Sequence, residues 1–134
     1  MSYKENKHYK RYTKKHKDVK EGVETLESFC NDDYSEMEVF GSLVRKDYYY
    51  GKSDCDAVFI TNNVDKTSAN FENYIANNAF LKLRRKKLVY YGLDKNKVDC
   101  SGMLFQLYVK NCKFDVVIVN KKDYQNYTNL IIPT

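Results

Sequence analysis

The sequence predicts a single α/β (α+β) domain in which a few helices and short strands share one hydrophobic core. Its 134 residues fall within the usual size of one domain. Apolar residues recur at helical spacing in two stretches, and short runs rich in β-branched residues are bounded by turn residues. We therefore expect residues 1–16 to form a basic flexible arm and residues 17–134 to form the folded domain.

The N-terminal arm is dominated by lysine and is expected to be flexible or a frayed helix. Residues 1–20 carry eight Lys and Arg against Glu5 and Asp18. Basic segments of this density attract polyanions, and interleaved tyrosines can stack on bases. A solvated, partly disordered tail is the alternative. The tyrosines are Tyr3, Tyr9 and Tyr12, and the candidate nucleic-acid-binding residues are Lys10, Arg11, Lys14 and Lys15.

The first predicted helix follows the arm and leads to a strand. The apolar residues at helical spacing are Val19, Val23, Leu26 and Phe29. The polar run Asn31-Asp32-Asp33 ends the helix. Residues 37–40 (MEVF) then alternate as in a short strand, which runs directly into Gly41-Ser42.

A second strand and a second helix come next. Residues 55–61 (CDAVFIT) predict the strand, which Asn62-Asn63 closes. The helix is predicted from Thr67 to a basic cluster at residues 82–87, with Asp65, Thr67 or Ser68 as its cap. Its apolar face comprises Phe71, Tyr74, Ile75, Ala79 and Leu83. The basic cluster, either a solvated helix face or a second nucleic-acid-binding site, comprises Lys82, Arg84, Arg85, Lys86 and Lys87.

Two further strands are predicted near the C-terminus. They are residues 103–109 (MLFQLYV) and 113–119 (KFDVVIV). The short segment 110–112 between them has the length of a hairpin connection. The preceding helix is then a candidate crossover between strands.

The composition argues against several classes of protein. No run of about 18 apolar residues is present, and the N-terminus lacks the apolar core of a signal peptide. We therefore expect a cytoplasmic or nuclear protein with no membrane partner. The four cysteines include no Cys-x-x-Cys pair, which argues against a zinc site or a disulfide framework. Both histidines, His8 and His16, lie in the arm, so Ser/His or Cys/His catalysis has no general base.

Asp54 and Asp56 are the first candidates for catalysis, because they flank Cys55 at the start of the second predicted strand. The two-residue period of a strand places both side chains on one face. Two carboxylates about 4 Å apart repel by roughly 1 kcal/mol in water and about 4 kcal/mol at an effective dielectric constant of about 20. Either one takes up a proton or a cation sits between them, and magnesium prefers such oxygen ligands.

Asp115 is the third candidate, a lone acid in the apolar strand at 113–119. A buried charge is expensive unless it is paired or metal-bound. If this strand lies beside residues 55–61, the three acids form one cluster that can hold two magnesium ions. Two such ions stabilise both the attacking and the leaving oxygens in phosphoryl transfer. The alternative is an edge-strand position that faces solvent.

Gly41-Ser42, directly after a strand, is a candidate nucleotide-binding site. Where a helical turn begins, free backbone N–H groups and a hydroxyl are available to the oxygens of a triphosphate. Gly41 lacks the Cβ that would block close approach, and Arg45 lies one turn on, where its guanidinium can add positive charge. An ordinary turn is the alternative interpretation.

Together these residues resemble the catalytic pattern of the polymerase beta type nucleotidyltransferase superfamily. In that family an apolar residue and Gly-Ser precede an Asp-x-Asp strand, and a third Asp follows on a later strand. Here the pattern reads Phe40-Gly41-Ser42, Asp54-Cys55-Asp56 and Phe114-Asp115-Val116. The forms Gly-Ser-x-x-Arg at 41–45 and Ser-Asp-x-Asp at 53–56 are most similar to the minimal nucleotidyltransferases. The resemblance covers roughly residues 20–120.

The resemblance implies a small mixed β-sheet flanked by helices and an enzyme that moves a nucleoside monophosphate from a nucleoside triphosphate to an acceptor hydroxyl, with release of pyrophosphate. It implies two magnesium ions on Asp54, Asp56 and Asp115, with manganese as a substitute, and triphosphate at Gly41-Ser42. One departure is Lys46, which stands where minimal members often have glycine.

The acceptor and the partners are less constrained. The two basic stretches favour a nucleic-acid 3′-end, and a partner protein is the next option, because minimal members can act as antitoxins that modify a toxin. Larger members add a second helical domain for which this chain has no room, so we expect a partner protein or a homodimer to complete the acceptor site. Two competing hypotheses are a catalytically silent nucleotide-binding module and a basic nucleic-acid-binding domain whose Asp pair caps a turn.

Overall fold

The computed structural model describes residues 2–91 and 100–124, which form a five-stranded mixed sheet with three α-helices. The α/β class expected from the sequence is therefore confirmed. The strands are β1 (Glu36–Phe40), β2 (Cys55–Thr61), β3 (Leu81–Tyr91), β4 (Cys100–Val109) and β5 (Cys112–Asn120). They lie in the order β1-β2-β5-β4-β3, with β2 and β5 parallel and the other neighbours antiparallel.

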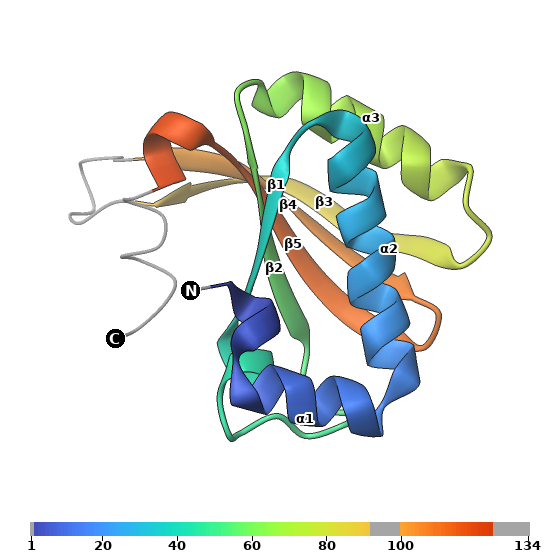
Figure 1. The fold of residues 1–134 in the computed structure, drawn as a ribbon. Helices are drawn as coiled ribbons and strands as arrows, with labels where there is room; N and C mark the ends of the chain where they lie inside the picture. Colours follow the sequence, from blue (N-terminus) through green and yellow to red (C-terminus); the bar gives the residue numbers. More distant parts are fainter. Residues whose placement is uncertain (1, 92–99, 125–134) are drawn as a thin grey trace.

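The helices lie mainly on one side of this sheet. They are α1 (Lys7–Lys15), α2 (Lys17–Asp33) and α3 (Val64–Ala76), together with the 3-10 helices η1 (Tyr3–Glu5), η2 (Gly41–Val44) and η3 (Lys121–Asp123). Figure 1 shows α2 and α3 over one face and α1 across the end at which β2 begins. Among the residues described, no helix has the length and hydropathy needed to cross a membrane.

An aromatic cluster fixes α2 and α3 to the sheet. Phe29 of α2, Phe59 of β2 and Phe71 of α3 contact one another with ring centroids 4.9 to 5.6 Å apart. Phe105 of β4 extends the cluster, 5.0 Å from Phe71. All four rings are buried. Because strand side chains alternate between faces, the residues next to these strand phenylalanines in sequence point to the opposite face. None of the α-helices in residues 2–91 and 100–124 covers that face, which is called here the helix-free face.

Most of the expected elements are confirmed. The first predicted helix is α2, and the strands predicted at 37–40 and 55–61 are β1 and β2. The predicted hairpin is formed by β4 and β5, joined through Lys110, whose backbone φ is 55°.

The second predicted helix is wrong beyond Ala76. The α3 helix starts after Asn63, whose side chain accepts a hydrogen bond from the backbone N–H of Lys66 at 3.1 Å. The cap is therefore none of the residues proposed from the sequence. The helix stops at Asn77, and the basic cluster lies on strand β3.

The register of β3 gives the physical reason for this error. Leu81 and Leu83 lie opposite Val109 and Leu107 of β4, so their apolar side chains enter the core at a period of two. Leu83 also fits the helical spacing of Phe71 and Ile75, and the sequence alone cannot choose between the two periods. Pairing with β4 decides for the strand.

The N-terminal segment also differs from the expected flexible arm. It folds into η1 and α1, which Ser2 and Asn6 cap through their side chains. Tyr3, Tyr9 and Tyr12 are only 5%, 8% and 7% exposed and belong to the main core. The rings of Tyr9 and Tyr12 supply the apolar face that anchors the otherwise polar α1 helix, an effect that the lysine content conceals.

Candidate active site

Asp56 and Asp115 are direct neighbours on the helix-free face of the sheet. They lie opposite each other in the parallel pairing of β2 with β5. The flanking residues Ala57 and Phe114 are buried in the core under the helices, so the two carboxyl groups point the other way. Strand β5 lies between β2 and β4, so the edge-strand alternative for Asp115 is wrong.

The environment of the two carboxyl groups disfavours their charged forms. Burial, followed by the charges of Asp115 and Asp54, raises the pKa of Asp56 to about 7, while the nearby Arg45 acts to lower it. The pKa of Asp115 is raised by burial and then by Asp54, against the lowering effects of Gln106 and Arg84. Such a pair is stabilised by a proton or by a cation.

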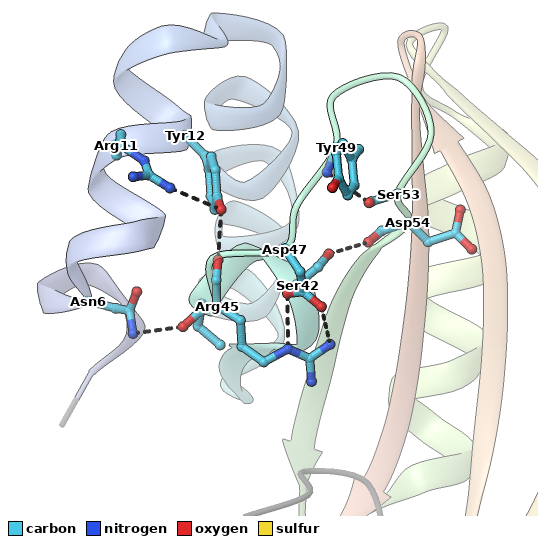
Figure 2. Close-up of polar contacts among 10 residues, drawn as sticks. Asn6, Arg11, Tyr12, Ser42, Arg45, Asp47, Tyr49, Ser53 and Asp54 are labelled. Carbon is cyan, nitrogen blue, oxygen red and sulfur yellow. Dashed lines mark hydrogen bonds and ion pairs between the residues drawn. The ribbon is translucent and has the colours of Figure 1, made fainter.

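Asp54 lies one residue before β2 and is exposed. Its backbone oxygen accepts a hydrogen bond from the Ser42 hydroxyl at 3.4 Å, which joins the end of β1 to the start of β2 (Figure 2). The Asp54 carboxylate acts on both other acids through its charge. The sequence pattern therefore brings Ser42 and all three acids to one end of the sheet.

Gly41 packs directly against Asp56. A Cβ added at Gly41 would lie 2.4 Å from Oδ2 of Asp56, and the backbone φ of Gly41 is +73°. Both the space and the backbone conformation therefore require glycine. The backbone at the start of η2 is therefore in direct contact with the carboxyl group of Asp56.

Arg45 follows η2 and interacts both with Asp47 and, through its charge, with Asp56. Its guanidinium pairs with Asp47 at 3.2 Å (Figure 2). The α1 helix holds the backbone beneath it, because the Tyr12 hydroxyl donates to the Arg45 carbonyl at 2.8 Å. Asn6 likewise donates to the carbonyl of Val44 at 3.2 Å.

The fit to a divalent cation rests on the acid pair. In residues 2–91 and 100–124, no three His, Cys, Asp or Glu side chains stand close enough together to hold a metal ion. Asp56 and Asp115 nevertheless supply adjacent carboxylate oxygens, the donor type that magnesium prefers, and magnesium takes its remaining ligands from water and substrate phosphates. The residues present fit such an ion through these two acids.

Gln106 and Arg84 are site residues whose roles the sequence did not indicate. Gln106 of β4 donates from Nε2 to Oδ1 of Asp115 at 3.3 Å. It is the one amide in an otherwise apolar or aromatic run at 103–109, the same kind of signal that identified Asp115. The charge of Arg84 acts on Asp115 because β3 lies next to β4 in the sheet, and no sequence pattern near Arg84 predicts that position.

The two basic stretches have different positions. Lys10, Arg11, Lys14 and Lys15 are exposed on α1. The stacking role expected for Tyr3, Tyr9 and Tyr12 is wrong, because their rings are buried. The cluster from Lys82 to Lys87 is exposed on β3 rather than on a helix, apart from Leu83.

Comparison with models of known protein families and with the sequences of curated proteins gives no match to this chain.

Proposed function

We propose that this protein is a magnesium-dependent nucleotidyltransferase of the polymerase beta type, which moves a nucleoside monophosphate from a nucleoside triphosphate to an acceptor hydroxyl. One observation carries the proposal: the acid pair of Asp56 and Asp115 has the backbone of Gly41 packed against it. Carboxylates bind the magnesium ion of metal–triphosphate complexes, and glycine-containing backbone turns commonly contact their phosphates.

The roles follow from position. Gly41 and Ser42 bind triphosphate oxygens through the backbone and the hydroxyl, and Arg45 adds positive charge when it leaves Asp47. Asp56 and Asp115 are the proposed ligands of magnesium, which when bound would neutralise the phosphate charge and polarise the α-phosphate. Asp54 adds its negative charge beside them.

The transfer step balances without any further reactant. The acceptor oxygen forms a bond to the α-phosphorus, and the bond from that phosphorus to the oxygen bridging to the β-phosphate breaks. Pyrophosphate leaves with the electron pair of that bond. The hydroxyl proton passes to the carboxylate of Asp115, which lies opposite Asp56 in the pairing of β2 with β5.

Pyrophosphate release tests this proposal. Wild type is incubated with each common ribonucleoside or deoxyribonucleoside triphosphate, magnesium or manganese, and a pool of RNA and DNA oligonucleotides. We expect release that a chelator abolishes and that Asp56→Asn lowers by more than about a hundredfold, since a direct ligand matters more than its supporting shell. The matched control is Asp32→Asn, an exposed acid on α2 with the same change of charge, which retains activity.

Two results would contradict the assignment. Full activity of Asp56→Asn would show that the acids do not form the catalytic site. Tight nucleotide binding that needs magnesium but never releases pyrophosphate, with any acceptor tried, would indicate a silent binding module instead.

A further inference from the structure

A row of aligned residues crosses the whole sheet on the helix-free face and is polar over most of its length. The strand registers place Phe40, Asp56, Asp115, Gln106 and Arg85 side by side, one on each strand in spatial order. Neighbouring strands lie about 4.8 Å apart, so the backbone of Arg85 is about 10 Å from that of Asp115. The acid pair and the edge strand β3 therefore share one continuous surface.

A β-bulge turns two arginines toward this surface. The register shifts between Leu83 and Arg85, which leaves Arg84 as the extra residue. The Arg84 guanidinium lies over the ring of Tyr108, 5.2 Å from its centroid. Because Leu107 is buried under the helices, Tyr108 is on the acid side, and so is Arg84. Bulges re-aim side chains in this way beside functional sites.

The lysines of β3 are divided between the two faces. Lys82 and Lys87 lie opposite Tyr108 and Leu104, on the acid side, and both are exposed. Lys86 points to the helix side, where it pairs with Glu72 of α3 at 2.8 Å and lies over the ring of Phe105. The set on the acid side, called here the β3 cation row, is Lys82, Arg84, Arg85 and Lys87.

Resting on the proposed function, we propose that the β3 cation row binds the phosphates of a single-stranded nucleic acid and brings its terminal hydroxyl to Asp56 and Asp115. The row spans five residue steps of an extended strand, about 17 Å, so its charges repeat along a line. Regularly spaced phosphates are the complementary partner. Lysine on an edge strand also discourages strand pairing, but that role would not require four cations on the side of the acids.

Lys87→Gln and Lys86→Gln provide the test, because they are adjacent, exposed, equal in charge change and on opposite faces. Binding of fluorescent oligouridylate and oligothymidylate of about 12 nucleotides is followed by anisotropy in EDTA, so that no transfer occurs. We expect Lys87→Gln, and likewise Arg85→Gln, to weaken binding several-fold and to reduce the slope of log affinity against log salt by about 1. Lys86→Gln should retain the wild-type slope. Circular dichroism verifies that each variant is folded.

The comparison between oligouridylate and oligothymidylate tells whether the acceptor is RNA or DNA. Equal losses in Lys86→Gln and Lys87→Gln would overturn the proposal, because net charge rather than the row would then govern binding. So would binding to a duplex or to polyglutamate that is as tight as binding to the single strand. The binding assay contains no metal, so it is independent of catalysis. If Lys87→Gln weakens binding and Lys86→Gln does not, the β3 cation row is supported even when no pyrophosphate release is found. If pyrophosphate is released but the two variants bind equally, only the proposal of the β3 cation row is removed.

Discussion

At the scale of single residues, Asp56 is the described carboxyl group whose pKa is raised furthest. It is half-buried on a central strand, and Asp115 lies directly opposite it on the neighbouring strand β5. The ordinary pKa of an aspartate is about 4, whereas that of Asp56 in the folded protein is raised to about 7. Without a bound cation, the ionised carboxylate of Asp56 therefore lowers the free energy of unfolding of the protein.

This raised pKa makes the metal-free protein sensitive to pH. Because the pKa of Asp56 is higher in the folded state, its contribution to stability is fully present below about pH 4 and is lost as the pH rises through about 7. Asp56→Asn removes that loss. We expect the melting temperature of Asp56→Asn minus that of wild type, in EDTA, to grow by a few degrees between about pH 4 and pH 8. Asp32→Asn is the control, and a difference that stays constant with pH would contradict the raised pKa.

Gly41 offers a second test with a built-in control. Gly41 and Gly51 both have positive φ, of 73° and 81°, but an added Cβ meets Asp56 at Gly41 and open space at Gly51. Alanine at either position should cost about 1–2 kcal/mol of unfolding free energy from the backbone alone, measured by urea denaturation. Only Gly41→Ala should also displace Asp56 and abolish pyrophosphate release. Equal activity in the two variants would show that the close approach is not part of the site.

The sequence identifies acids more readily than their partners. A two-residue period and a lone acid in an apolar strand were enough to single out Asp56 and Asp115, because both signals are local. Gln106 carries the same local signal, a polar residue in an apolar run. The position of Arg84 depends on a bulge and on the order of the strands, and neither is determined by nearby residues.

At the scale of elements, α1 is the support for the η2 turn. Its buried tyrosines hold it in the core, and the Tyr12 hydroxyl reaches the backbone of Arg45. The sequence does not predict this helix as a folded element, because its exposed lysines dominate the composition. Strand β3 escapes prediction for a related reason, since its charged residues hide an alternation that only pairing with β4 reveals.

Tyr12→Phe tests the supporting role of α1. Loss of the hydroxyl leaves the Arg45 carbonyl without its 2.8 Å hydrogen bond and should lower the unfolding free energy by about 1 kcal/mol. Tyr9→Phe is the matched control, because the Tyr9 hydroxyl makes no hydrogen bond to a described residue and its ring is equally buried. Pyrophosphate release should fall in Tyr12→Phe only. Equal behaviour of the two variants would mean that α1 merely packs.

At the scale of the whole molecule, metal binding should couple to stability. A ligand that binds only the folded state stabilises it by about 2.7 kcal/mol at about 100 times its dissociation constant. We therefore expect magnesium with a nucleoside triphosphate to raise the melting temperature of wild type by several degrees. The double variant Asp56→Asn/Asp115→Asn should not respond. A similar rise in both proteins would place the ion elsewhere.

The parallel pairing of β2 with β5 divides the candidate site between two halves of the chain. Gly41, Asp54 and Asp56 precede α3, whereas Gln106 and Asp115 follow β3. A chain cut in the connection between α3 and β3 would leave each half with only part of the acid set. Neither fragment should bind metal or transfer a nucleotide alone, and recovery on mixing would report that β5 of one fragment had docked against β2 of the other. Nucleotide transfer would then measure how much of the folded protein re-forms from the two fragments.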